Sequence, residues 1–150
     1  MNITWYHKHF EELITTELYQ ILQLRNEVFI VEQNCPFQDL DDKDLKCYHF
    51  IGLDTDAQKV SAYTRIVPAG ISFEEASIGR VVTSPLARNE GIGKQLMNKS
   101  IELLEELYGS VSIKIGAQLY LKKFYESFGF QQVENVYLED GIEHILMIRK

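Results

Sequence analysis

The feature that most constrains the fold of this chain is the stretch from Ser77 to Leu107, where a strand, a glycine-containing loop and a long helix are expected in direct succession. Residues 78–84 are rich in β-branched side chains and precede Pro85, which favours a short strand that ends in a turn. Apolar residues then recur at helical spacing over residues 96–108, before a glycine at position 109. A loop that opens straight into a helix is a typical place for an anion to bind.

The loop itself has the chemistry of a phosphate site. It consists of Arg88, Asn89, Glu90, Gly91, Ile92, Gly93 and Lys94. The first turn of a helix has unpaired N–H groups at the positive end of its dipole, and the two glycines leave that backbone open to a ligand. Arg88 and Lys94 add positive charge beside it. The loop therefore predicts a cradle for a phosphate or pyrophosphate, with a plain strand-to-helix turn as the competing interpretation.

Two well-known glycine loops do not fit this stretch. A Walker A loop would need a glycine where Arg88 stands and a serine or threonine where Gln95 stands. The dinucleotide-binding fingerprint would need a third glycine where Leu96 stands. The loop is therefore assigned to neither class of nucleotide-binding protein.

Length and charge narrow the class of protein. A chain of 150 residues is long enough for a full core, and no linker or repeat divides it, so residues 1–150 are expected to form one domain. A formal net charge of -7 argues against a broad nucleic-acid surface, which needs dense positive charge. The N-terminus does not resemble a signal peptide, and no window is long enough for a membrane span. We therefore expect a cytoplasmic protein that binds neither nucleic acid nor membrane.

No metal site is predicted. Cys35 and Cys47 have a spacing that matches no metal or redox motif, so we expect reduced, partly buried thiols. His7 and His9 lie on one face of a predicted first strand, but two histidines without a third ligand make a poor metal site.

The order of the remaining elements indicates a mixed α/β domain, in which antiparallel hairpins flank a strand, helix, strand unit. Strands are expected over residues 3–7, 49–53, 59–67, 111–115, 132–138 and 144–149, and further helices over residues 16–32 and 119–128. Thr15 or Thr16 is expected to cap the first helix, and Asp140-Gly141 predicts a tight turn in the last hairpin.

Two motifs in this chain resemble those of the GNAT superfamily of N-acetyltransferases. Arg88-x-x-Gly91-x-Gly93 matches the R/Q-x-x-G-x-G/A loop of that superfamily, and downstream Phe124-Tyr125 and Gly129-Phe130 match its second motif in the right order and separation. Two further segments resemble the bacterial ElaA family within it, so that the resemblance covers nearly the whole chain. These are Leu24-Arg25-x-x-Val28-Phe29-x-x-Glu32-Gln33 and Tyr137-x-Glu139-Asp140-Gly141-Ile142-x-His144.

The resemblance implies the GNAT fold, a central mixed, mostly antiparallel sheet flanked by helices and splayed between its fourth and fifth strands. It also implies acetyl-CoA as the acyl donor, with its pyrophosphate on residues 88–94 and its pantetheine arm along Val81, Val82 and Thr83. Gln118 stands where many members place a cofactor-contacting asparagine. Arg25 is expected to fix the first helix to the sheet.

The chemistry that the resemblance implies is direct acetyl transfer to the amine of a small molecule or peptide. Tyr125 would protonate the departing thiolate, although a tyrosine there could also be a core aromatic, and a backbone N–H near Val82 could hold the oxyanion. The general base is open, because Ser77 stands where some members carry a glutamate. The candidates for it are Glu32, Asp41, Asp44, Glu74 and Glu75.

Two other functions compete with this one. The missing carboxylate at Ser77 favours a catalytically silent acyl-CoA-binding or regulatory module, and Arg25-x-x-Val28-Phe29 is similar to a segment of acyl-homoserine-lactone synthases. Acceptor specificity is expected in residues 33–44, whose carboxylates face either solvent or a substrate amine, and around residues 139–142. Exposed strands of the last hairpin could support a homodimer.

Overall fold

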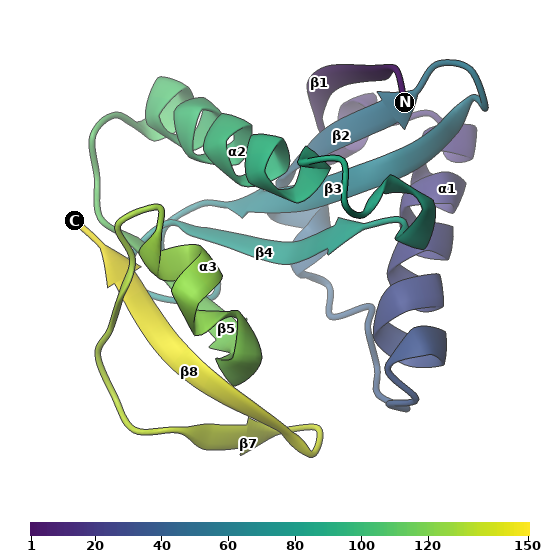
Figure 1. Ribbon diagram of the computed structural model, residues 1–150. Coiled ribbons are helices and arrows are strands. Elements are labelled where there is room, and N and C mark those ends of the chain that lie inside the picture. Colours follow the sequence, from purple (N-terminus) through teal and green to yellow (C-terminus); the bar gives the residue numbers. More distant parts are fainter.

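The strands form two antiparallel sheets that diverge from a single point of contact (Figure 1). The computed structural model describes residues 1–150. The first sheet has the order β1-β2-β3-β4, made of β1 Ile3–His9, β2 Tyr48–Asp54, β3 Lys59–Val67 and β4 Ser77–Thr83. In the second sheet β8 pairs with each of the other strands, and its members are β5 Ile113–Gln118, β6 Gln131–Gln132, β7 Tyr137–Glu139 and β8 Ile142–Arg149.

The first sheet is covered by a helix on each face (Figure 1). Side chains of β3 alternate between the two faces, and the strand is buried from Val60 to its end because both faces are covered. Ala62 and Ile66 pack in the larger core with α2 Ile92–Tyr108, whereas Tyr63 packs in the smaller core with α1 Thr15–Arg25. The short helix α3 Lys122–Glu126 lies against the second sheet.

Backbone pairing joins the two sheets only where β4 and β5 begin. Ala76 pairs with Ile113 in a parallel bridge, and the N–H of Lys114 donates to the carbonyl of Ala76 at 3.0 Å. Beyond this bridge β4 and β5 diverge, so β4 is paired with β3 on one edge and has an open edge on the other. The implied GNAT sheet, splayed between its fourth and fifth strands, is confirmed.

A β-bulge shapes the open strand. The register of β3 and β4 jumps between Tyr63 opposite Val82 and Arg65 opposite Gly79, so that Arg80 and Val81 together face a single residue of β3. Arg80 takes a left-handed backbone conformation with φ of 50°. The bulge turns this part of β4 away from regular pairing with β3.

The expected first helix is present but changes form along its length. Regular α-helix ends at Arg25, and residues Asn26–Glu32 continue as a π-helical turn. Neither threonine caps it, because Thr15 is already helical and Ile14 precedes it. The carboxylate of Glu17 accepts from the N–H of Ile14 at 2.9 Å and supplies the cap instead.

Three boundaries in the C-terminal half differ from the sequence prediction. The strand expected over residues 111–115 is β5, which extends to Gln118 and so contains the residues expected to lead into a helix. The helix expected over residues 119–128 is a 3₁₀ turn Leu119–Leu121 followed by α3. The strand expected over residues 132–138 is divided into β6 and β7, although the hairpin turn at Asp140-Gly141 is confirmed, with both residues at positive φ. None of the helices is long and apolar enough to cross a membrane.

Candidate functional site

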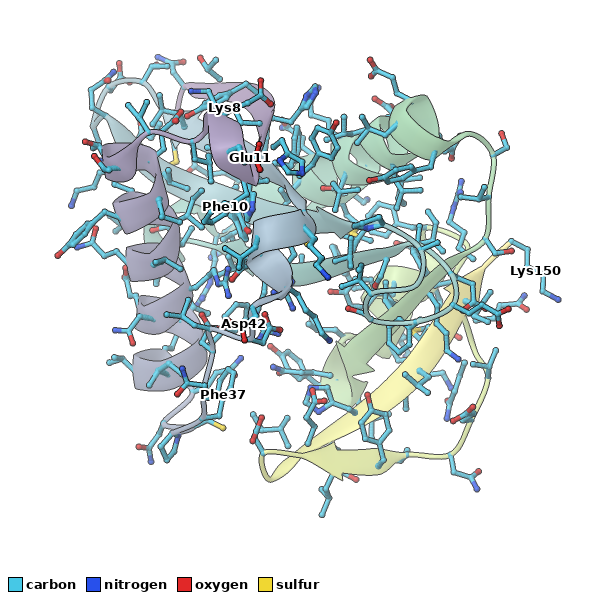
Figure 2. The ribbon with its side chains drawn as sticks, turned by 180° about the vertical axis from the view of Figure 1, so that it is seen from behind. Lys8, Phe10, Glu11, Phe37, Asp42 and Lys150 are labelled. Atoms are coloured by element: carbon cyan, nitrogen blue, oxygen red, sulfur yellow. The ribbon has the colours of Figure 1, made fainter.

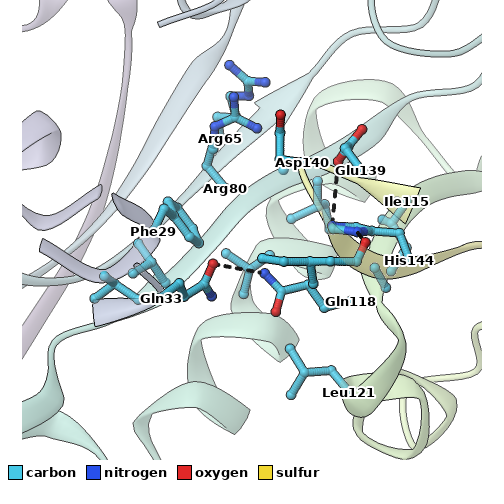
Figure 3. Close-up of a pocket in the computed structure, with 18 of the residues that line it drawn as sticks. Phe29, Gln33, Arg65, Arg80, Ile115, Gln118, Leu121, Glu139, Asp140 and His144 are labelled. Atoms are coloured by element: carbon cyan, nitrogen blue, oxygen red, sulfur yellow. Dashed lines mark hydrogen bonds and ion pairs between the residues drawn. The ribbon is translucent and has the colours of Figure 1, made fainter. Parts of the chain in front are cut away.

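A cavity of about 840 Å³ lies in the gap between β4 and β5 (Figure 3). Its walls come from the π-helical turn, the connection that follows it, β3, β4, the start of α2, β5, α3 and the hairpin of β7 and β8. Seven of the residues predicted to contact acetyl-CoA line it: Val81, Val82, Thr83, Arg88, Gly93, Gln118 and Tyr125. The splay of the sheets therefore brings the two sequence motifs to one cavity.

The predicted anion cradle lies where α2 begins. Gly91 has a φ of 73° and precedes the helix, and no side chain caps the N–H groups that follow it. A side-chain atom added at Gly93 would meet nothing within 4 Å, so the backbone of the first turn is open. Because the N–H groups are uncapped and the space beside them is free, this turn fits a phosphate.

Not every residue of the predicted cradle lines the cavity. Asn89, Glu90, Gly91, Ile92 and Lys94 lie outside its wall. The side chain of Ile92 is 4% exposed and packs in the larger core, which leaves only its backbone for a ligand. Glu90 accepts from the N-terminal ammonium of Met1 at 3.2 Å, and the side chain of Lys94 is exposed.

Arg88 forms a two-pronged ion pair with Glu32 at the edge of the cavity. Its Nη1 and Nη2 donate to the two carboxylate oxygens at 2.9 and 2.7 Å, and both side chains are 40% exposed. The hydrogen bond from Arg88 holds the pKa of Glu32 below its usual range. Glu32 is one of the five candidates for the general base, and its carboxylate is already paired with a cation.

Tyr125 lies both in the core and on the cavity wall. It is 5% exposed and packs edge-on against Phe124 and Phe130. Burial raises the pKa of its phenol, with a smaller contribution from Tyr120, so the hydroxyl is protonated at neutral pH. The two interpretations of Tyr125 are therefore compatible: the ring is a core aromatic and the residue faces the cavity.

Gln118, at the end of β5, is held by a contact across the cavity (Figure 3). Its Nε2 donates to Oε1 of Gln33 in the segment after the π-helical turn, at 3.3 Å. A second contact spans the same gap, because Sγ of Cys35 donates to the carbonyl of Asp140 at 3.2 Å. The second sheet and its hairpin turn are thus linked at two points to the segment that follows the π-helical turn.

The acidic connection after α1 has a structural role that the sequence did not reveal. Seen from behind, Phe37 and Asp42 mark this connection between α1 and β2 (Figure 2). Three of its four aspartates alternate with three arginines in a closed ring, in which each carboxylate bridges two guanidinium groups. The ring runs Arg25, Asp39, Arg80, Asp41, Arg65, Asp44 and back to Arg25, with closest contacts between 2.6 and 3.3 Å.

The ring corrects the expected role of the acidic connection. The carboxylates of Asp39, Asp41 and Asp44 are paired with arginines and not left to solvent or a substrate amine, whereas Asp42 is exposed. Asp41 and Asp44 are thus occupied as general-base candidates. Burial opposes ionisation of Asp44, but its hydrogen bond from Arg25 and the charges of Arg25 and Arg65 outweigh this and lower its pKa. Arg25 is fully buried and ties α1 to the connection, in line with its predicted role.

The two arginines that the sheet contributes to this ring, Arg65 and Arg80, were not identified from the sequence. Arg65 and Arg80 stand on β3 and β4 among β-branched residues, and both line the cavity. A charged residue on a strand that is otherwise buried is the signal that could have identified them, because such a charge requires a partner.

His144 and Glu139 are a further pair of functional groups on the cavity wall. Nδ1 of His144 lies 2.7 Å from the carbonyl of Ile142, and its Nε2 lies 3.5 Å from a carboxylate oxygen of Glu139. The sequence placed both residues in the ElaA-like segment and Glu139 in a region expected to set acceptor specificity, but it assigned neither residue a role in catalysis. The two remaining base candidates, Glu74 and Glu75, do not line the cavity.

Neither cysteine pairs with the other, and both are buried and free, as predicted. Burial raises the pKa of the Cys47 thiol to about 11. No group of three or more His, Cys, Asp or Glu side chains is arranged to hold a metal ion.

Comparison with known proteins agrees with this geometry. A family model described as an acetyltransferase (GNAT) domain matches residues 23–150. Protein ElaA of Escherichia coli is 44% identical over 99% of this chain and 97% of its own length, and its crystal structure superposes with a TM-score of 0.91 over 99% and 100% of the two chains. An acyl-CoA N-acyltransferase from Pseudomonas aeruginosa, 39% identical, superposes with a TM-score of 0.93 over 99% and 100% of the chains.

A more distant similarity concerns the fold alone. A CoA-dependent acyl-homoserine lactone synthase, solved with SAM and isopentyl-CoA, is 14% identical and superposes with a TM-score of 0.78 over 98% of this chain and 82% of that one. The family model and the near relatives decide the assignment. This chain belongs to the GNAT acetyltransferases, in the family of ElaA, and is an acyltransferase that uses an acyl-CoA donor.

Proposed function

We propose that this protein transfers an acetyl group directly from acetyl-CoA to an amine, which belongs to a small molecule or to a peptide. The observation that carries the proposal is the cavity between β4 and β5, which connects the uncapped start of α2 with the protonated hydroxyl of Tyr125. An anion site and an open strand edge can bind the pyrophosphate and the pantetheine arm of an acyl-CoA, and a proton donor can protonate its leaving sulfur.

The pyrophosphate of the donor fits the start of α2. The N–H groups of the first turn, including those of Gly93 and Lys94, have no side-chain partner, and the helix dipole favours an anion there. Arg88 adds a guanidinium at the cavity edge. Because Glu32 occupies that guanidinium, binding of the donor would compete with the ion pair between them.

The pantetheine arm fits the open edge of β4. An amide-containing chain can pair with an unpaired strand edge through main-chain hydrogen bonds, and Val81, Val82 and Thr83 line the cavity on that strand. The bulge at Arg80 and Val81 brings irregular backbone to the same place. A backbone N–H near Val82 is our candidate for holding the oxyanion that develops on the thioester oxygen.

Tyr125 is assigned to protonate the leaving sulfur. A thiol titrates near pH 8.5, so a departing thiolate gains from a donor that is protonated at neutral pH. The side-chain amide of Gln118 can contact the donor once its hydrogen bond to Gln33 opens, at the position where many GNAT members place a cofactor-contacting asparagine.

Two related proteins support an acyl-CoA donor. The P. aeruginosa relative is named as an acyl-CoA N-acyltransferase, and the distant synthase was solved with isopentyl-CoA. Acetyl as the acyl group, the amine acceptor, a single domain over residues 1–150, a homodimer through the β7 and β8 hairpin and a cytoplasmic location remain our predictions.

Substitution of Gly93 by leucine tests the anion site. We expect at least a tenfold loss of acetyl-CoA affinity, about 1.4 kcal/mol, because the new side chain would fill the space beside the first helical turn. Gly93 does not have a positive φ and lies inside the helix, so the same change should leave the unfolding temperature equal or higher. Thermal unfolding with and without acetyl-CoA measures both effects.

The matched control is Asn98 to leucine, an exposed position further along α2. This variant should keep the full stabilisation by acetyl-CoA, which is about 2.7 kcal/mol at 100 times the Kd. Wild-type affinity in the Gly93 variant would show that the donor does not bind at the start of α2.

A further inference from the structure

We infer that His144 is the general base of the reaction, and that His144 and Glu139 together bind the acceptor amine. This inference rests on the proposed function, because it assigns a role within the same acetyl transfer. It answers the question that the sequence left open, since Ser77 stands where some relatives carry a glutamate and the candidate carboxylates are paired or lie off the cavity.

The first argument is the orientation of the imidazole. Nδ1 of His144 lies 2.7 Å from the carbonyl oxygen of Ile142, and a carbonyl oxygen only accepts hydrogen bonds, so Nδ1 must carry the proton. In a neutral imidazole, Nε2 then has no proton and carries a lone pair. The backbone of β8 thus fixes the tautomer in which Nε2 is the basic atom.

The second argument is what faces this lone pair. Oε2 of Glu139 lies 3.5 Å from Nε2, and the two atoms are both acceptors when the histidine is neutral (Figure 3). A donor that lies beside both acceptors can bond to each of them, and an ammonium or amine supplies several N–H groups in a small volume. The pair therefore has the chemistry of a site for a primary amine.

The third argument is that the pair is built into the cavity wall. His144 is 8% exposed and stands opposite Gln118 on β5 and opposite Tyr137 on β7. The Tyr137 ring lies 5.8 Å from the imidazole, and its hydroxyl fits over Gly116, where any Cβ would lie 3.1 Å away. These neighbours hold the imidazole in place, as a catalytic base requires.

Glu139 is more exposed than His144 but its position is anchored. The side chain is 59% exposed, yet the next residue, Asp140, accepts from Sγ of Cys35 through its carbonyl at 3.2 Å. This contact fastens the hairpin turn to the segment after α1. Glu139 is accordingly a substrate-binding residue, which attracts the amine and stabilises the imidazolium that forms.

Charges elsewhere on the wall do not neutralise the pair. Arg65 and Arg80 are bound in the ring with the aspartates and Arg88 is paired with Glu32, and none of these three arginines makes an ion pair with Glu139. The titratable groups on the walls around His144 are Glu139 and Tyr137 from β7, Asp140 from the turn, Arg65 from β3, Arg80 from β4, Tyr125 and Tyr120 from the α3 region, and Glu32, Cys35, Asp41, Lys43 and Arg88.

The proposed step balances as follows. An acceptor bound as an ammonium first gives one nitrogen proton to Nε2 of His144. The neutral amine nitrogen then forms a bond to the thioester carbon as the carbon–sulfur bond breaks, the sulfur takes the phenol proton of Tyr125, and the second nitrogen proton leaves to solvent. Exchange with solvent then returns both side chains to their starting states. Because an alkylamine titrates near pH 10, most of it is protonated at pH 7, and a base must act for attack to occur.

The test is substitution of His144 by glutamine, assayed by thiol release from acetyl-CoA with two probe amines of similar shape. Ethylamine is protonated at pH 7, whereas 2,2,2-trifluoroethylamine is largely neutral. We expect kcat/KM with ethylamine to fall by about 10²- to 10⁴-fold at pH 7 and to recover as the pH is raised, whereas the loss with trifluoroethylamine should be far smaller. Stabilisation by acetyl-CoA should be unchanged.

Two further variants separate catalysis from structure. Glu139 to glutamine should raise KM for ethylamine more than it lowers kcat, because the charge that attracts the ammonium is lost. Glu143 to glutamine removes a carboxylate on the opposite face of the same hairpin and should behave like the wild type.

The outcomes are distinguishable. Equal losses with both amines, or an unchanged pH profile in the His144 variant, would overturn the base assignment while leaving the transferase intact. A wild-type protein that releases no thiol with either amine or with a wider amine panel would overturn the proposed function, and the base assignment with it.

Discussion

Replacing Tyr125 with phenylalanine is expected to lower kcat by about 10²- to 10⁴-fold, the range typical of a lost general acid. The residue is 5% exposed and lines the cavity, and burial raises the pKa of its phenol. The substitution removes only the hydroxyl and keeps the ring that packs on Phe124 and Phe130. Affinity for acetyl-CoA should therefore stay within a few-fold of the wild type.

Tyr108 to phenylalanine is the matched control for this measurement. Tyr108 ends α2 outside the cavity wall, so loss of its hydroxyl should leave kcat unchanged. Single-turnover rates with saturating acetyl-CoA isolate the chemical step from product release. A Tyr125 variant with the wild-type rate would remove the residue as the acid and leave it as a core aromatic.

Substitution of Arg25 by alanine is expected to have the largest effect on stability. Its guanidinium is fully buried and donates to Asp39 and Asp44 at 2.9 and 2.8 Å, and it also lies 5.9 Å from the centre of the Tyr63 ring. Removing one member of a buried ion pair leaves the partner charges without compensation, which costs about 3 to 5 kcal/mol. Urea unfolding measures this loss directly.

The comparison variant is Arg88 to alanine. Its ion pair with Glu32 has equally short contacts but 40% exposed side chains, and exposed pairs are worth about 0 to 1 kcal/mol. If the two variants lost similar stability, the ring of arginines and aspartates would not be a buried support of the cavity wall.

The elements with strong local signals were predicted well from the sequence. The strand, loop and helix from Ser77 to Tyr108 fold as expected, because the β-branched run, the glycine at positive φ and the helical spacing all favour the same structure. The hairpin turn at Asp140-Gly141 was equally clear. The sheet splay came from the family resemblance and not from any local pattern.

The errors arose where long-range contacts decide the structure. The sequence around Gln118 shows no local preference for a strand. Pairing of Gln118 with His144 on β8 extends β5 to this residue. Three aspartates of the acidic connection, Asp39, Asp41 and Asp44, looked like solvated loop charges. Their partners Arg65 and Arg80 lie 21 to 41 residues further along the chain, too far to be recognised from local sequence. Loop carboxylates and strand arginines carry no sequence mark that pairs them.

The catalytic base was missed for the same reason. His144 belongs to the ElaA-like segment, but a lone histidine on a strand carries no sequence signal for a role as a base. Its chemistry depends on the carbonyl of Ile142, the carboxylate of Glu139 and the cavity formed by the other sheet. Only the folded structure brings these groups together.

The most direct test of the central claim is release of free CoA thiol from acetyl-CoA in the presence of a panel of polyamines, amino sugars, amino acids and peptides. We expect thiol release that depends on one class of amine, with the acetylated amine identified by mass spectrometry, and slower release from longer acyl-CoA donors. Silence across the panel, together with no thermal stabilisation by acetyl-CoA, would contradict the account.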